Sequence, residues 1–319
     1  MRSLITGASG YIGHRLLSMC IEHNLPIVGC VRNRKQAKAI PTDSVIVEDI
    51  VSFNQWDQVL KGIDIIVHLA AQAHVLSGNS NSSNAIDEMM AINRDAVLRL
   101  ATAAENANVK RFVYVSSIGV LGNSTNGYVL DNKSDYDPKE QYAQSKMEAE
   151  IGLKKISESS KIEIVIIRPP LVYGADAPGN FNRLLKLVGM GMPLPLGGMH
   201  AKKSMISLDN LCDLLMKTMT APLPKLTKLV VSDGSDWSTA ELVSLIAKYM
   251  GKKRALFSLP LPLLMTIASF VGKKVEVRKL AVPLQVDGSE TTKILNWSPV
   301  QSPEDGVKEA VEYYLAHNT

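Results

Sequence analysis

The sequence predicts an α/β protein in which helices cover both faces of a doubly wound parallel sheet, with a smaller C-terminal portion interleaved with it. Three observations predict this class. Short apolar runs alternate with longer amphipathic stretches, a glycine-rich turn follows the first run, and the rhythm changes after residue 170. Runs that are apolar throughout are typical of strands buried on both faces of a parallel sheet.

The first half of the chain supplies the predicted strands and helices in alternation. Three segments place apolar residues at three- and four-residue steps, as helices packed on a sheet do. These helices are expected at 12–23, 85–107 and 142–156. The predicted strands are 3–6, 27–31, 45–47, 63–69, 112–115 and 162–167.

After residue 170, stretches rich in Gly and Pro at 177–180 and 189–198 predict loops on a substrate side. Residues 205–208 and 229–231 are expected to rejoin the sheet. The second portion is therefore predicted to be interleaved with the first.

Composition excludes several classes of function. The net charge of +4 is spread along the chain, and its densest basic clusters, 32–35 and 273–274, are too short for a nucleic-acid surface. The three cysteines are odd in number and far apart, without the spacing of a disulfide framework or a metal site. A reducing cytoplasm is the expected location. The predicted first strand leaves no room for a secretory leader.

The segment 259–271 is the most apolar run of the chain. It is shorter than the roughly 20 residues that a membrane span requires, and two prolines interrupt it. We predict no transmembrane segment and expect a buried helix here; a weak contact with a membrane surface is the alternative.

A glycine-rich turn follows the first predicted strand and opens the first helix. Glycines lack Cβ, so backbone N–H groups can approach a pyrophosphate, and the positive end of the helix favours its charge. The turn therefore predicts a dinucleotide site of Rossmann type. The residues expected to touch the cofactor are Gly7, Ser9, Gly10, Tyr11, Ile12 and Gly13.

The end of the second predicted strand decides between NAD and NADP. NAD binding favours a carboxylate there, and this chain has Arg32 instead. Arg32 with Arg34 or Lys35 is suited to bind a 2′-phosphate through charge-assisted hydrogen bonds. We therefore favour NADP(H), with NAD(H) as the alternative.

A Tyr and a Lys lie four residues apart on one predicted helix face, at Tyr142 and Lys146. We expect the ammonium, helped by an oxidised nicotinamide, to lower the pKa of the Tyr142 phenol so that it serves as acid or base. Ser117 lies 25 residues before Tyr142, a separation that resembles that of the catalytic serine in the short-chain dehydrogenase/reductase superfamily. The resemblance implies that its hydroxyl polarises the reacting oxygen. Ser116 is the competing candidate.

The glycine spacing and the Tyr and Lys motif together resemble the extended short-chain dehydrogenase/reductase superfamily. Segments 168–174, 203–211 and 295–299 are similar to nucleotide-sugar epimerases and dehydratases, so the resemblance covers nearly the whole chain. It implies a UDP- or dTDP-sugar substrate and a homodimer formed through 85–107 and 142–156.

The resemblance also implies roles for further residues. Asn93 is expected to support the active site through structure. Lys203 and Arg278 match positions that bind a diphosphate, unless they are ordinary surface cations, and Asn180 either binds substrate or caps a helix. The further cofactor contacts that the resemblance implies are Asp49, Ile50, Leu69, Ala70, Ala71, Tyr142, Lys146 and Pro169.

The resemblance is strongest to a bacterial branch labelled the UDP-glucose 4-epimerase family. That branch includes 4-keto reductases that make UDP-N-acetyl-6-deoxyhexosamines, of the N-acetylquinovosamine or fucosamine type, for O-antigen and related polysaccharides. We expect such an NADPH-dependent reductase, with a UDP-hexose or UDP-N-acetylhexosamine 4-epimerase as the alternative and an NADP-sensing protein without catalysis as the less favoured one. A 4,6-dehydratase is disfavoured because Ile118 and Gly119 occupy the places of its Asp and Glu pair.

These inferences predict two interleaved units. Residues 1–174 and about 204–235 are assigned to the NADP(H)-binding Rossmann domain. Residues 175–203 and 236–319 are assigned to the portion that binds the nucleotide sugar.

Overall fold

The computed structural model describes residues 1–73, 83–125, 127–253, 256–270 and 272–318. Its main sheet has seven strands in the order β3-β2-β1-β4-β5-β6-β9, and every neighbouring pair is parallel. The predicted doubly wound sheet is confirmed. The strands are β1 (Ser3–Thr6), β2 (Ile27–Val31), β3 (Ser44–Ile46), β4 (Ile65–His68), β5 (Arg111–Val115), β6 (Glu163–Arg168) and β9 (Leu226–Val230).

The strand order reverses direction at β1, which pairs with both β2 and β4. Thr6 is in register with Cys30 on one side and His68 on the other. Open parallel sheets bind ligands beyond the carboxyl ends of their strands, at such a reversal. The chain after β1 therefore stands where a dinucleotide would bind.

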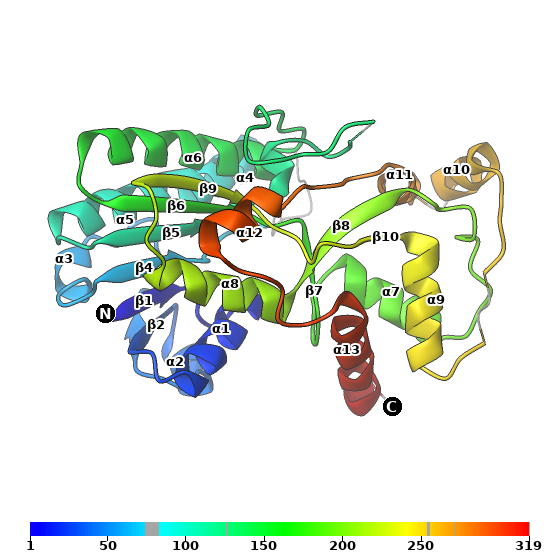
Figure 1. Cartoon of the computed structure of the whole chain (residues 1–319), viewed down its shortest axis with the longest axis horizontal. Coiled ribbons are helices and arrows are strands. Elements are labelled where there is room, and N and C mark those ends of the chain that lie inside the picture. Colours follow the sequence, from blue (N-terminus) through cyan, green and yellow to red (C-terminus); the bar gives the residue numbers. More distant parts are fainter. Residues whose placement is uncertain (74–82, 126, 254–255, 271, 319) are drawn as a thin grey trace.

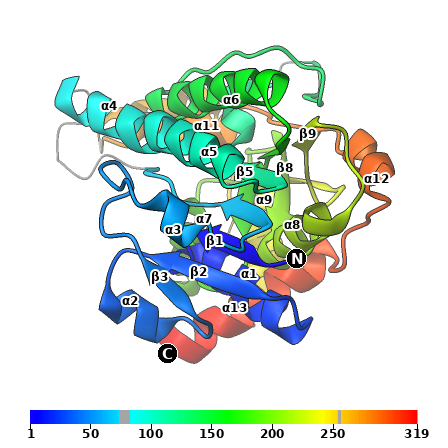
Figure 2. The same ribbon diagram turned by 90° about the vertical axis from the view of Figure 1, so that its left-hand side faces the viewer.

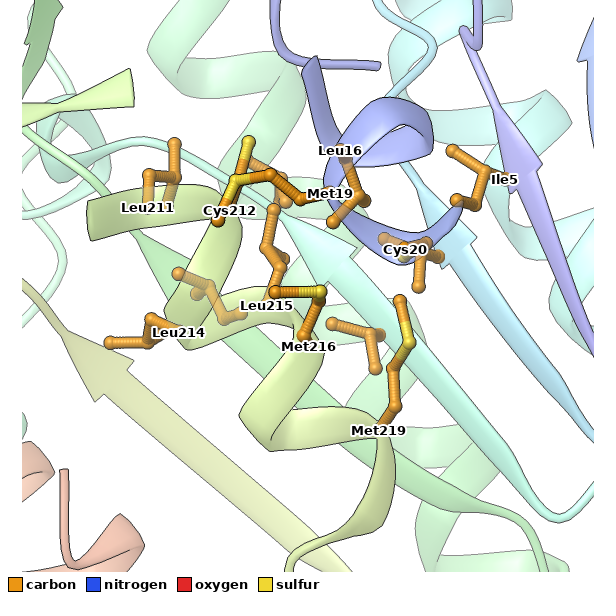
Figure 3. Close-up of a cluster of buried hydrophobic side chains, with 14 of the residues drawn as sticks. Ile5, Leu16, Met19, Cys20, Leu211, Cys212, Leu214, Leu215, Met216 and Met219 are labelled. Atoms are coloured by element: carbon orange, nitrogen blue, oxygen red, sulfur yellow. The ribbon is translucent and has the colours of Figure 1, made fainter. Parts of the chain in front are cut away.

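Helices cover both faces of the sheet (Figure 2). One face packs on α1 and α8, the other on α3, α5 and α6. Figure 3 shows Met216 and Met219 of α8 against Met19 and Cys20 of α1. The helices named here are α1 (Tyr11–Glu22), α3 (Trp56–Val59), α5 (Ala96–Asn106), α6 (Gln141–Ser159) and α8 (Leu208–Thr220).

The predicted helix at 85–107 is interrupted in the structure. It consists of α4 (Ser83–Met90), a π-helical segment (Ala91–Asp95) and α5. Periodicity alone does not reveal such an interruption, because buried apolar positions occur both before and after it.

A second, three-stranded sheet has the order β10-β8-β7, formed by β7 (Leu171–Tyr173), β8 (Lys202–Ser207) and β10 (Asp236–Ser238). The expectation that residues 205–208 rejoin the main sheet is therefore wrong. β8 pairs in parallel with β7 and antiparallel with β10, since the chain leaves the main sheet after β6. The expectation for 229–231 holds in β9, and the proposed domain boundaries remain a prediction.

The smaller portion, around the second sheet in Figure 1, has its own apolar core. Phe181, Ile246 and Val311 are buried in it and come from three different helices. These helices are α7 (Asn180–Gly189), α9 (Thr239–Tyr249) and α13 (Pro303–Asn318). The remaining helices are α2 (Arg34–Ala39), α10 (Leu261–Phe270), α11 (Lys274–Ala281) and α12 (Ser289–Leu295).

The apolar run at 259–271 forms α10, but the expectation of a buried helix is wrong. Only Leu264 and Ala268 of this helix are buried. The helix lies at the outer end of the smaller portion (Figure 1), and Leu264 belongs to the apolar core there. Val271 lies outside the described residues. No helix in the described part of the chain is both long and apolar enough to cross a membrane.

Candidate active site

The glycine-rich turn between β1 and α1 requires its glycines for close backbone contacts. A Cβ on Gly13 would lie 2.2 Å from the carbonyl oxygen of Gly7, and one on Gly7 would lie 2.8 Å from the amide nitrogen of Ala70. Gly7 also has a φ of +67°, which favours glycine. The turn therefore packs tightly against both its own helix and the residues after β4.

The amino end of α1 suits a pyrophosphate. Gly10 is its N-cap, and no side chain caps the helix there. The first N–H groups of a helix have no partner within it, and they carry partial positive charge. Ser9 and Gly10 are exposed, and Tyr11 and Ile12 are half-buried. This cradle of backbone groups fits the phosphates of a dinucleotide, as the sequence predicts.

Three basic side chains follow β2. Arg32, Arg34 and Lys35 are exposed, and none forms an ion pair or side-chain hydrogen bond with a described residue. The backbone between them is ordered, since Gln36 accepts from the Arg32 amide at 2.9 Å and donates its own amide to Asn33 at 3.0 Å. The cations are thus presented on a fixed turn with their charge unpaired.

Asp49 forms a turn of its own after β3. Its carboxylate accepts from the Ser52 hydroxyl at 2.6 Å and the Val51 amide at 2.9 Å. The Ser52 hydrogen bond and then that of Val51 lower the pKa of Asp49, so the carboxylate is ionised at neutral pH. Ile50 beside it is half-buried against the core.

The other predicted cofactor residues lie at the carboxyl ends of β4 and β6. Leu69 and Ala70 are half-buried after β4, and Ala71 is exposed. Pro169 is buried after β6, and its carbonyl oxygen accepts a hydrogen bond from Ile118, next to Ser117, at 2.9 Å. Strand ends of the main sheet therefore carry these residues as expected.

Tyr142 and Lys146 lie one turn apart on α6, as predicted. The Lys146 ammonium donates to the carbonyl oxygen of Val115 at 2.9 Å, and Val115 ends β5. Lys146 Nζ also lies 4.6 Å from the ring centroid of Tyr114 and 5.9 Å from that of Tyr142. The lysine thus ties the helix that carries Tyr142 to the strand that precedes Ser117.

Burial dominates the charge states of the pair. It lowers the pKa of Lys146 to about 7, against the opposing attraction of Glu150. It raises the pKa of Tyr142 to about 12. The predicted lowering of the Tyr142 pKa depends on Lys146 together with an oxidised nicotinamide and remains a prediction. In the chain by itself, desolvation disfavours the phenolate and raises the pKa. The phenol is protonated, ready to donate.

Of the two serines after β5, Ser117 presents its hydroxyl. It caps the one-turn helix Ile118–Val120, its Oγ accepts from the Gly119 amide at 3.2 Å, and it is half-buried. The Ser116 hydroxyl is buried and has no hydrogen-bond partner within the described chain. This difference supports Ser117 over Ser116 as the residue that meets a substrate.

Asn93 joins the cofactor side to the catalytic helix. Its Oδ1 accepts from the Gln72 amide at 2.9 Å, and its Nδ2 donates to the Gln72 carbonyl and the Ser145 hydroxyl, both at 3.0 Å. Ser145 in turn donates to the carbonyl oxygen of Tyr142 at 2.8 Å. Asn93 lies in the π-helical segment and is fully buried, and such segments are frequent at functional sites. The predicted supporting role fits this geometry.

The sequence analysis missed a buried ion pair one turn behind Lys146. Glu150 and Arg168 are both almost fully buried and meet at 2.6 Å. Tyr136 donates to the same carboxylate at 2.8 Å. The only signal in the sequence is the four-residue step from Lys146 to Glu150, which places them on one helix face. The Glu150 carboxylate attracts the Lys146 ammonium and so opposes the lowering of the Lys146 pKa by burial.

The predicted substrate residues lie on the smaller portion. Gly179, with φ of +77°, is the N-cap of α7, so Asn180 is not a cap; its side chain is exposed. Lys203 donates to the carbonyl oxygen of Val282 at 2.6 Å, and burial lowers its pKa to about 8. Arg278 lies on α11, four residues before Val282, and is exposed. The two cations therefore border the same segment.

Comparison with known proteins agrees with this geometry. The model of the NAD dependent epimerase/dehydratase family matches residues 3–209. A UDP-glucose 4-epimerase of Vibrio cholerae is 33% identical and covers 99% of this chain and 96% of its own length. An N-acetyl-alpha-D-glucosaminyl-diphospho-ditrans,octacis-undecaprenol 4-epimerase of Escherichia coli O157:H7 is 27% identical over 90% of this chain and 87% of its own.

Solved structures share the fold over the whole length. UDP-glucuronic acid 4-epimerase from Bacillus cereus, in complex with NAD, has a TM-score of 0.79 at 18% identity, with 100% of both chains covered. The dTDP-glucose 4,6-dehydratase DesIV from Streptomyces venezuelae has a TM-score of 0.78 at 20% identity, covering 99% of this chain and 98% of its own. With the glycine turn and the Tyr142 and Lys146 pair in place, the chain belongs to the NAD-dependent epimerase/dehydratase family, of extended short-chain dehydrogenase/reductase type.

Proposed function

We propose that this enzyme reduces the C4 ketone of a UDP-4-keto-6-deoxy-N-acetylhexosamine with NADPH, in the synthesis of a bacterial surface polysaccharide. The observation that carries the proposal is the turn after β2. Arg32 stands there at the position where NAD binding favours a carboxylate. Its side chain is exposed and forms no ion pair with a described residue. A guanidinium suits a 2′-phosphate, because planar donors pair with phosphate oxygens. A reductase consumes its reductant at every turnover, so a preference for NADPH serves it.

Each of the site residues has a separate role in the proposed hydride transfer. Bound NADPH supplies the hydride to C4. The Tyr142 phenol, protonated because burial raises its pKa, donates the proton to the C4 oxygen. The Ser117 hydroxyl donates a hydrogen bond to the same oxygen and orients it. Lys146 holds the catalytic helix to the end of β5.

The diphosphate of the substrate is assigned to the smaller portion. Lys203 and Arg278 both border the segment that ends α11, and two cations suit two phosphates. Asn180, at the exposed start of α7, is free to bind the sugar or the nucleotide because it does not cap the helix. We also propose a homodimer formed through α4, α5 and α6.

A 4-epimerase is the second candidate. It is favoured by the relative from Vibrio cholerae, named as a UDP-glucose 4-epimerase, which covers 99% of this chain. Such an enzyme oxidises and re-reduces the same carbon and needs no net reductant. The same Ser117, Tyr142 and Lys146 serve both reactions, so the fate of the reductant distinguishes them.

The test is a pair of parallel reactions. One contains the purified protein, UDP-4-keto-6-deoxy-N-acetylhexosamine and NADPH, and nicotinamide absorbance is followed. The other contains UDP-N-acetylglucosamine without added reductant, and the sugar product is identified. We expect stoichiometric loss of NADPH in the first and no product in the second. An N-acetylgalactosamine product in the second, with NADPH unchanged in the first, would establish the epimerase instead.

A further inference from the structure

Helix α10 exposes the apolar side chains that a helix of a water-soluble protein normally buries. Leu263, Ile267 and Phe270 follow one another at steps of four and three residues and share one face. Their exposed fractions are 49%, 45% and 88%. The opposite stripe, Leu264 and Ala268, packs on the protein. An apolar stripe of this kind on a surface marks an interaction site.

Lysines lie directly beside this stripe. Lys273 and Lys274 follow the helix, and Val275 after them is 65% exposed. Lys273 pairs with Glu276 at 3.2 Å on the surface, whereas Lys274 has no ion-pair partner in the described chain. Over 261–281 the sequence has four basic side chains and one acidic one. We name Leu263, Ile267, Phe270, Lys274 and Val275 the α10 surface.

An apolar stripe next to a segment with a net positive charge complements one particular partner, an anionic lipid bilayer. The apolar groups enter the boundary between headgroups and acyl chains, and each lysine near the surface gains from the negative potential of the lipids. A second copy of the chain fits less well, because its own lysines would meet these lysines. The positive charge of the α10 surface therefore favours an anionic lipid bilayer as its binding partner.

The α10 surface is connected to the candidate active site through α11. Helices α10 and α11 pack on each other. Lys279 of α11 pairs with Glu140 at 2.6 Å, and Glu140 is the N-cap of α6, two residues before Tyr142. Lys203 bonds to Val282 just after the same helix. A bilayer against α10 would thus lie on the side where substrate residues gather.

We propose that the α10 surface docks this enzyme on anionic membranes, with α10 lying in the plane of the headgroups. The helix has 10 residues and is therefore about 15 Å long, half the hydrocarbon thickness of a bilayer, so it lies on the membrane and does not cross it. The inference does not depend on whether the enzyme is a reductase or an epimerase.

Vesicle flotation tests the proposal. The purified full chain is mixed with vesicles of phosphatidylcholine alone or with phosphatidylglycerol added, at low and high salt. We expect the protein to float with the anionic vesicles at low salt and to bind at least tenfold less to the neutral ones. Absence of flotation with the anionic vesicles would overturn the proposal.

Matched variants locate the contact. Phe270→Asp, and separately Lys273→Glu with Lys274→Glu, are each expected to reduce binding to anionic vesicles at least tenfold. The controls are Val300→Asp, since Val300 is 62% exposed elsewhere, and Lys217→Glu with Lys225→Glu, two exposed lysines on α8 and just before β9. Equal losses in the controls would contradict the assignment to α10. A second result would also contradict it. If light scattering showed that Phe270→Asp dissociates a dimer while vesicle binding is unchanged, this face would be an interface between copies of the chain. Circular dichroism checks that each variant is folded.

Discussion

Lys146 donates a hydrogen bond from Nζ to the carbonyl oxygen of Val115, 2.9 Å away, and so joins the catalytic helix to the last residue of β5. Ser117 follows Val115 by two residues, and Tyr142 precedes Lys146 by one helical turn. This hydrogen bond therefore links the helix that carries Tyr142, the proposed proton donor, to the strand that precedes Ser117, the proposed orienting residue. Asn93 donates to Ser145 on the same helix, and Ser145 donates to the carbonyl oxygen of Tyr142.

Tyr142→Phe should abolish most turnover and leave cofactor binding intact. The phenol is the proposed proton donor, and losing general acid catalysis costs roughly 10²- to 10⁴-fold in rate. Steady-state kinetics and calorimetric titration with NADPH measure the two effects. Tyr249→Phe, on α9, is the control and should keep full activity. Equal activity of the two variants would remove Tyr142 from the mechanism.

Arg32→Ala should weaken NADPH binding by roughly 10- to 100-fold, because a charge-assisted hydrogen bond to the 2′-phosphate is lost. Binding of NADH, which lacks that phosphate, should change little. Calorimetric titration with both cofactors tests this, with Lys38→Ala on α2 as a control that leaves both affinities unchanged. A wild-type enzyme that binds NADH more tightly than NADPH would contradict the assignment.

Gly13→Ala should destabilise the protein by about 1–3 kcal/mol or prevent cofactor binding. The new Cβ would lie 2.2 Å from a backbone oxygen that cannot move aside without shifting the turn. Urea denaturation and NADPH titration measure both effects. The control is Gly288→Ala, whose Cβ would meet nothing closer than 3.5 Å. If Gly13→Ala matches this control, the packing of the turn is not as described.

Glu150→Gln should cost roughly 3–5 kcal/mol of unfolding free energy, because it leaves the Arg168 guanidinium buried without its partner charge. Urea denaturation measures the loss. Glu158→Gln breaks an exposed pair with Lys154 on the same helix and should cost less than about 1 kcal/mol. Similar losses in the two variants would argue against the buried pair.

Stability should fall as the pH drops from 6.5 toward 3, in part because of His68. Burial lowers its pKa to about 3 from an unfolded value of 6.5, so between these values the unfolded state binds a proton that the folded state does not. Unfolding free energy therefore rises with pH across this window. His68→Asn should flatten the dependence measured by urea denaturation over that range. An unchanged slope would show that other groups account for it.

Much of the fold could be predicted from the sequence because buried parallel strands are apolar throughout. β1 and β2 have their predicted bounds. The proximity of Tyr142 and Lys146 could also be predicted, because residues four apart on a helix share one face. β8 could not be placed, since strand pairing between distant segments leaves no local signal. The exposure of α10 was missed for a related reason, because an apolar run is consistent with either a core or a membrane as its environment.

The charge of the site was harder to predict than its position. The sequence spacing predicts that Lys146 lies beside Tyr142. The pKa values of both side chains, however, depend on how deeply the surrounding strands and helices bury them. The Glu150 and Arg168 pair joins a helix to a strand 18 residues away, and no spacing rule connects them. Asn33, which caps α2 beside Arg32, was likewise recognisable only once the turn was seen.

Deuterium transfer tests the central claim most directly. NADPH carrying deuterium at the transferable position of the nicotinamide is incubated with the UDP-4-keto-6-deoxy-N-acetylhexosamine and the enzyme, and the sugar product is analysed by mass spectrometry and NMR. The account predicts one deuterium at C4 of the product with the wild-type protein, formed at least about 100-fold more slowly with Tyr142→Phe. A product without deuterium at C4, or the same rate from both proteins, would contradict it.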